Sequence, residues 1–122
     1  MAKVMVVDDS EHQRCQLKKD LESAGHVVIE GLDGQDGLDK LWKNLDVTLI
    51  ICDVNMPGMD GITMCSKIHE SAKFPGVPIF MLTSEASPDL KKTAKQFGVR
   101  AWITKPYLTP KLLEAVEKVT KK

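Results

Sequence analysis

The sequence contains no apolar run long enough to cross a membrane. Its longest uninterrupted apolar runs, such as residues 49–52, have the length of a β-strand, whereas a membrane-spanning helix needs roughly 18 or more apolar residues. The first residues also contain no apolar stretch followed by a cleavage site, so we expect no secretory signal peptide. The sequence therefore predicts a cytoplasmic protein without membrane insertion.

Cysteine is scarce as well. The chain has only Cys15, Cys52 and Cys65, an odd number, with no C-x-x-C spacing and no accompanying histidine cluster. A disulfide framework or a zinc site would need regularly spaced cysteines, so we expect neither. Because free cysteine is commonly buried, we expect three reduced and largely buried thiols.

Neither sign of charge is in excess. The 17 basic and 17 acidic residues give a net charge of zero, which argues against strong nonspecific binding to nucleic acid. The charges are unevenly distributed, however. Residues 1–85 carry 8 basic and 14 acidic side chains, a net of −6, and residues 86–122 carry 9 basic and 3 acidic, a net of +6. We infer one chemistry in the first part and a different, basic surface in the second.

What the sequence does contain is an alternation of short apolar runs and amphipathic stretches. Of its 122 residues, 43% are hydrophobic and 28% charged, which is the balance of a globular protein. Five strands are predicted by the apolar runs at residues 4–7, 27–29, 47–52, 77–82 and 101–104. Each run is followed by apolar residues at helical spacing, and no linker, repeat or low-complexity segment interrupts the pattern.

Capping residues mark the helix boundaries. Ser10, with Gln13 three residues later, predicts a capping box at the start of the first helix, and Gly25 is suited to end that helix. Ser87 followed by Pro88 predicts an N-cap and a first helical residue. Five strand–helix units in succession therefore predict an α/β fold of one domain over residues 1–122, a doubly wound five-stranded parallel sheet with right-handed crossovers.

Polar residues follow four of the predicted strands at their carboxyl ends, where doubly wound sheets bind ligands. Those residues are Asp8 and Asp9, Asp53, Thr83 and Ser84, and Lys105 before a proline. Three crowded carboxylates repel one another, and a hard cation such as Mg²⁺ would relieve the repulsion. With a lysine and a hydroxyl nearby, the cluster suits phosphoryl transfer to a carboxylate.

Each of these residues has an ordinary structural explanation when taken alone. An acidic pair before a helix can simply compensate the helix dipole, and a threonine or a lysine–proline pair can simply end a strand. Their coincidence at four strand ends, in the order that the fold predicts, favours a functional site.

These motifs resemble the signature of response-regulator receivers. The similarity rests on Asp8-Asp9, the CDVNMPGMDG sequence at residues 52–61, Thr83-Ser84 and Lys105-Pro106, and it extends over nearly the whole chain. Among receivers, the sequence is most similar to CheY-like chemotaxis regulators. The resemblance implies a flavodoxin-like (β/α)5 fold with strand order 2-1-3-4-5, and a single receiver domain without an output domain.

The resemblance also implies a phosphoacceptor and a metal site. Asp53 would accept the phosphoryl group. Mg²⁺, or Mn²⁺ in its place, would be held by Asp9, Asp53 and the backbone carbonyl of Asn55, with Asp8 acting mainly through a metal-bound water. Lys105 would pair with the phosphoryl group, and its bond to the following proline would be cis.

Further positions of the family pattern concern switching and its rate. Thr83 would reach toward the phosphoryl group, and the small Ser84 would leave that group room to enter. Asn55 and Glu85 occupy the variable positions that tune dephosphorylation. Trp102 stands where the family usually has Tyr or Phe, so the switching side chain is larger in this sequence.

The resemblance predicts a signalling switch rather than a turnover enzyme. A histidine kinase or another phosphodonor would phosphorylate Asp53, and the protein, expected to be monomeric, would then bind a partner such as the flagellar motor. The predicted docking surface comprises the fourth helix, fifth strand and fifth helix, with the basic residues Lys91, Lys92, Lys95, Arg100, Lys111 and Lys118. We expect no nucleic-acid partner.

Two alternative functions are also compatible with the sequence. A phosphorelay shuttle that passes the phosphoryl group to a histidine would use the same residues, although the Asn55 and Glu85 pair mildly favours direct output. A haloacid-dehalogenase-type phosphatase also uses an aspartate nucleophile on a parallel sheet. Its second acid would fall at Asn55, and the chain has no room for a cap domain.

Overall fold

Five parallel strands form a single sheet at the centre of the molecule. The computed structural model describes residues 2–85 and 87–120. The strands are β1 (Lys3–Val7), β2 (Val27–Gly31), β3 (Leu49–Cys52), β4 (Ile79–Thr83) and β5 (Val99–Thr104). Their order is β2-β1-β3-β4-β5, and each neighbouring pair is parallel. The predicted flavodoxin-like sheet, with its strand order, is confirmed.

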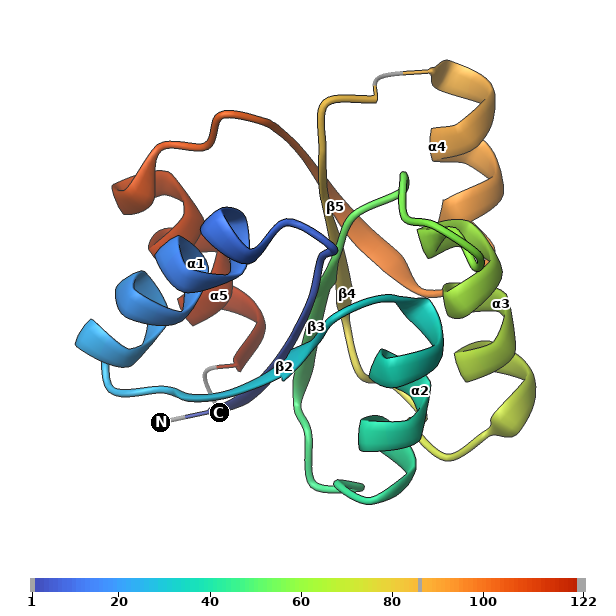
Figure 1. Cartoon of the computed structure of the whole chain (residues 1–122), viewed down its shortest axis with the longest axis horizontal. Helices are drawn as coiled ribbons and strands as arrows, with labels where there is room; N and C mark the ends of the chain where they lie inside the picture. Colours follow the sequence, from blue (N-terminus) through green and yellow to red (C-terminus); the bar gives the residue numbers. More distant parts are fainter. Residues whose placement is uncertain (1, 86, 121–122) are drawn as a thin grey trace.

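Five helices connect the strands and cover both faces of the sheet. They are α1 (Glu11–Ser23), α2 (Gly34–Trp42), α3 (Gly61–Ser71), α4 (Pro88–Lys95) and α5 (Thr109–Thr120). Figure 1 shows α1 and α5 on one side of the sheet and α2, α3 and α4 on the other. The sheet is thus the middle layer of three. Among the described residues, no helix is long and apolar enough to cross a membrane.

The inner strands β1, β3 and β4 are almost entirely apolar because helices cover both of their faces. In β1, Val4 and Val6 belong to the apolar cluster with α1 and α5, whereas Met5 and Val7 belong to the cluster with α2 and α3. All four side chains are fully buried. This explains why the sequence shows unbroken apolar runs rather than the alternation of a half-exposed strand.

The predicted helix starts are confirmed by their hydrogen bonds, but the reciprocal bond of the predicted capping box is replaced, because the Ser10 N–H donates to Asp8 Oδ1. The Ser10 side chain accepts from the N–H of Gln13, and the Ser87 side chain accepts from the N–H of Leu90, with Pro88 at the start of α4. Gly25, after α1, has a φ of 92°, the left-handed conformation that glycine adopts most readily.

Some boundaries and burial states differ from the predictions. β4 begins at Ile79 rather than at residue 77, after Pro78, which has no N–H to donate to a neighbouring strand. β5 begins at Val99, two residues before the predicted start, because an edge strand tolerates the exposed Arg100. Cys15 is exposed, so the expectation that all three thiols are buried is wrong.

The two other cysteines lie in the core between β3 and α3. The Sγ atoms of Cys52 and Cys65 are 4.0 Å apart, and the Cys52 Sγ is 3.4 Å from the Sδ of Met81. The interaction with Cys65, together with burial, raises the pKa of the Cys52 thiol well above its usual value. Cys52 is therefore held as a neutral thiol immediately before Asp53 in the chain.

Candidate functional site

Three carboxylates meet at the carboxyl edge of the sheet, as the sequence predicts. Asp8 and Asp9 directly follow β1, and Asp53 directly follows β3. One carboxylate oxygen of each residue lies within 4.8 Å of those of the other two. Asp8 and Asp53 are buried, at 2% and 7% exposure, whereas Asp9 is exposed. The cluster is thus accessible to solvent from the Asp9 side.

The backbone pairing of the sheet fixes the two buried acids. The N–H of Asp53 donates to the carbonyl of Val7 at 3.1 Å, and the N–H of Asp8 donates to the carbonyl of Gly31 at 3.2 Å. These bonds continue the parallel ladders one residue beyond the strands. The side chains of Asp8 and Asp53 therefore extend from backbone that is hydrogen-bonded to the sheet.

Lys105 bridges the two buried carboxylates. Its Nζ lies 2.9 Å from Asp8 Oδ2 and 2.8 Å from Asp53 Oδ2. Its backbone N–H donates to the Thr83 carbonyl at 3.0 Å, and the Lys105–Pro106 bond is cis, as expected. Burial opposes the ammonium charge, but the hydrogen bonds to Asp53 and Asp8 outweigh it and raise the pKa of Lys105. A fixed positive charge therefore lies against Asp53.

The loop after β3 passes close behind Asp53. The N–H of Asn55 donates to Asp53 Oδ1 at 3.2 Å, and the N–H of Gly61 donates to the Val54 carbonyl at 2.8 Å. A Cβ at position 61 would collide with the Asp53 carbonyl oxygen, so only glycine allows this approach. The loop thereby brings Asn55 beside the carboxylate cluster.

The backbone of Glu85 connects Thr83 to Trp102, a link that the sequence did not reveal. The N–H of Glu85 donates to Thr83 Oγ1 at 3.1 Å, and its carbonyl accepts from the Trp102 indole N–H at 2.7 Å. Thr83 is fully buried and Trp102 is half-buried. A movement of the threonine hydroxyl would therefore disturb the same peptide segment that holds the indole.

The remaining predicted positions surround the opening of the site. Asn55 is exposed, and its side-chain Nδ2 lies 3.4 Å from the Glu85 carboxylate. Ser84 is exposed between Thr83 and Glu85. The two side chains predicted to tune dephosphorylation thus contact each other across the opening.

The residues present fit a hard divalent cation. Three carboxylate groups, one of them solvent-exposed, provide oxygen ligands, and the hydrogen bond between the Asn55 N–H and Asp53 places the Asn55 backbone beside them. Mg²⁺ prefers oxygen ligands and keeps several of its waters, so a partly open acidic cluster suits it better than a closed cage would. Asp8, Asp9, Asp53 and Asn55 could hold such an ion.

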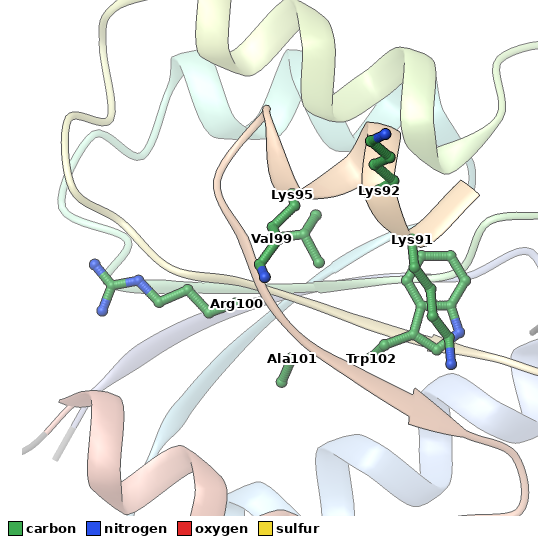
Figure 2. Close-up of a pocket in the computed structure, with 7 residues that line it drawn as sticks. All are labelled: Lys91, Lys92, Lys95, Val99, Arg100, Ala101 and Trp102. Carbon is green, nitrogen blue, oxygen red and sulfur yellow. The ribbon is translucent and has the colours of Figure 1, made fainter. Parts of the chain in front are cut away.

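A basic hollow lies between α4 and β5, and none of the three carboxylates lines it. It has a volume of about 310 Å³ and is lined by Lys91, Lys92, Lys95, Val99, Arg100, Ala101 and Trp102. Figure 2 shows Lys91 over the Trp102 ring, with Arg100 pointing away from both. The Lys91 Nζ is 5.9 Å from the ring centroid. A second hollow of about 330 Å³ between β5 and α5 shares Trp102 with the first.

The chain is similar in sequence to response regulator receiver domains and to chemotaxis proteins of the CheY type. The family model described as response regulator receiver domain matches residues 4–117. The chain is 38% identical over 118 residues to a chemotaxis protein CheY homolog of Campylobacter jejuni, covering 96% of this chain and 91% of that protein. It is 36% identical over 118 residues to chemotaxis protein CheY1 of Helicobacter pylori, covering 96% and 95%.

Solved structures resemble the chain over nearly its full length. Chemotaxis protein CheY4 of Vibrio cholerae has a TM-score of 0.91 and 37% sequence identity, and the match covers 98% of both chains. A likeness of this extent includes the sheet and all five helices.

Proposed function

Because the chain belongs to the response regulator receiver domain family, we propose that it is a chemotaxis-type two-component response regulator that accepts a phosphoryl group on Asp53. The observation that carries this proposal is the contact between Asp53 Oδ2 and Lys105 Nζ, 2.8 Å apart, within a cluster of three carboxylates. The donor would be a histidine kinase or a small phosphodonor, and the protein would act in the cytoplasm as a monomeric receiver.

The proposed reaction follows from the groups around Asp53. Its carboxylate oxygen attacks the phosphorus of the donor, and the bond from phosphorus to the leaving group breaks with its electron pair on that group. Lys105 balances the charge of the phosphoryl oxygens, and the Thr83 hydroxyl donates to one of them. Asp8, Asp9, Asp53 and the Asn55 carbonyl would hold Mg²⁺, which would supply positive charge against the phosphoryl group.

Labelling with a small phosphodonor tests the proposal. Incubation with acetyl phosphate and Mg²⁺ should add one phosphoryl group per chain by intact-mass analysis. The same incubation with excess EDTA should add none, because the three carboxylates then repel the donor. Absence of labelling with both acetyl phosphate and phosphoramidate would contradict the proposed function, and robust hydrolysis of added phosphate monoesters would favour a phosphatase instead.

We propose that phosphorylation reaches the basic hollow through Thr83 and Trp102. A phosphoryl group can shift a conformational equilibrium only by binding one state better than the other. A hydrogen bond from Thr83 to an anionic oxygen is worth roughly 1.5–3 kcal/mol. Thr83 Oγ1 already accepts from the Glu85 N–H, and the Glu85 carbonyl holds the Trp102 indole. Reorientation of Thr83 would therefore loosen or shift Trp102.

Trp102 fluorescence should report this coupling. The chain has a second tryptophan, Trp42, which stacks on Phe74 with ring centroids 6.0 Å apart. The Trp42→Phe variant removes it, so that Trp102 is the single source of tryptophan fluorescence. Beryllofluoride with Mg²⁺ should then change the emission of Trp102, and the change should shrink in Thr83→Ala while beryllofluoride still binds. Equal emission with and without beryllofluoride in the protein with Thr83 intact would rule the coupling out.

The face formed by α4, β5 and α5 is the proposed docking surface. It carries exposed lysines around an apolar floor that includes Val99, Ala101 and part of Trp102. Lys118 is paired with Glu114 at 3.8 Å, so the lysines of α4 supply most of the available positive charge. An acidic, amphipathic segment of a partner, such as a flagellar motor component, would complement this surface.

Charge reversal on α4 should slow partner association. In Lys91→Glu/Lys95→Glu, the association rate constant of the phosphorylated protein with a flagellar motor switch protein should fall about tenfold at low salt, with a flatter salt dependence, because electrostatic steering is lost. Stopped-flow kinetics at several salt concentrations measures both. The matched control is Lys43→Glu/Lys67→Glu, which reverses two exposed lysines outside this face. Equal rates in the two double variants would place the partner elsewhere.

A further inference from the structure

Arg14 is a buried cation beside the acidic cluster. It lies on α1, one turn after the Ser10 N-cap, and only 8% of it is exposed. A buried charge is costly unless it is paired and hydrogen-bonded. Arginine also remains charged in proteins. Its retention in the interior therefore requires specific partners.

The guanidinium group binds the backbone of the site. Arg14 Nη1 donates to the carbonyl oxygen of Asp8 at 2.6 Å. On its other side, Arg14 Nε lies 3.5 Å from Glu30 Oε1, and Glu30 Oε2 is also 3.6 Å from Lys18 Nζ. Glu30 on β2 thus lies behind the guanidinium as a counter-ion, without a hydrogen bond to Nε, while Nη1 faces the turn after β1.

The Asp8 carbonyl belongs to the peptide group that joins Asp8 to Asp9. Because a peptide group is planar and contains both flanking Cα atoms, a hydrogen bond to this carbonyl also restrains the Cα of Asp9. The Asp8 side chain has its own restraints, since Oδ1 accepts from the Ser10 N–H at 2.9 Å and Oδ2 contacts Lys105. From the residues that the structure describes, no hydrogen bond or ion pair reaches the Asp9 carboxylate.

We infer that Arg14 is a positioning residue for the metal site, which orients the Asp8–Asp9 peptide so that the Asp9 carboxylate faces Asp8 and Asp53. This inference rests on the proposed Mg²⁺ site. The guanidinium charge by itself has the opposite effect, because a nearby cation disfavours binding of another cation. When Arg14 is replaced, a positioning role therefore predicts weaker Mg²⁺ binding, whereas a purely electrostatic role predicts tighter binding. The direction of the change in Mg²⁺ affinity separates the two roles.

Mg²⁺ titration calorimetry on three variants tests the inference. Arg14→Met, which keeps an apolar stem of similar length, should weaken Mg²⁺ binding about tenfold, and Arg14→Lys should recover part of the loss. Lys18→Met is the matched control. It removes the other cation at Glu30 without a bond to the Asp8 carbonyl, so its Mg²⁺ affinity should stay within about twofold of wild type.

A second readout follows the peptide directly. In metal-free protein, the amide resonances of Asp9 and Ser10 should move in Arg14→Met and stay near their wild-type positions in Lys18→Met. Thermal melts establish that each variant is folded at the temperature used, and Glu30→Gln provides a milder perturbation of the same guanidinium if Arg14→Met does not fold.

The possible failures are distinguishable. Unchanged or tighter Mg²⁺ binding in folded Arg14→Met, while wild type binds Mg²⁺, would overturn the role of Arg14 and leave the proposed function intact. If Arg14→Met does not fold, an unchanged Mg²⁺ affinity in Glu30→Gln would equally overturn the positioning role of Arg14. Wild-type protein that binds no Mg²⁺ would contradict the proposed function itself.

Discussion

Asp53→Asn is expected to abolish phosphorylation of the protein. The asparagine amide has nearly the same shape as the carboxylate but no anionic oxygen to attack phosphorus, so no acyl phosphate can form at this position. Incubation with acetyl phosphate and Mg²⁺, followed by intact-mass analysis, should show one added phosphoryl group in wild type and none in the variant. A loss of more than about a hundredfold in labelling rate is expected.

The variant should remain folded, because Lys105 keeps its contact with Asp8 at 2.9 Å when the Asp53 charge is removed. Asp39→Asn is a suitable control, since Asp39 is an exposed acid on α2 away from the cluster. Its labelling should equal that of wild type. If Asp53→Asn were labelled as fully as wild type, another carboxylate would be the acceptor, and peptide mapping of the labelled chain would identify it.

The fold could be predicted from the sequence because its local signals agree with one another. Capping at Ser10 and Ser87, the apolar run before Asp53 and the glycine after the first helix all point to alternating strands and helices. Strand edges were less predictable. β5 starts at Val99 because pairing with β4 extends it past the exposed Arg100, and such pairing depends on the neighbouring strand rather than on residue type. The exposure of Cys15 likewise depends on which face of α1 turns outward.

The candidate site could be predicted in its residues but not in its contacts. Parallel topology alone brings Asp8, Asp53 and Lys105 to one edge, so their proximity follows from the order of the strands. The bridge from Thr83 through the Glu85 backbone to Trp102 uses main-chain groups, which every residue carries and no motif marks. The role of Arg14 could not be predicted either, because a single arginine on a polar helix is usually solvent-exposed, and only the structure shows that this one is buried.

Replacement of Asp9 should weaken Mg²⁺ binding without lowering the stability of the metal-free protein. Asp9→Ala is expected to weaken Mg²⁺ binding at least tenfold, about 1.4 kcal/mol or more, because one of three carboxylates is lost from the cluster. In the absence of metal the same change should leave the free energy of unfolding unchanged or raise it. The Asp9 side chain is exposed and has no hydrogen bond or ion pair from the described residues, so its removal mainly relieves repulsion from Asp8 and Asp53.

Asp8→Ala provides the contrast that makes this prediction specific. Asp8 is 2% exposed, and its two carboxylate oxygens interact with the Ser10 N–H and with Lys105. Its removal should cost roughly 1–3 kcal/mol of metal-free stability, because two hydrogen bonds that are partly shielded from solvent lose their acceptor. Titration calorimetry with MgCl₂ and urea melts in EDTA measure both quantities for both variants. Unchanged Mg²⁺ affinity in Asp9→Ala would remove Asp9 from the metal site, and a metal-free Asp9→Ala less stable than wild type would show that the carboxylates do not strain the fold. The two outcomes are independent, because affinity depends on the geometry around the ion and metal-free stability depends on the repulsion that remains without it.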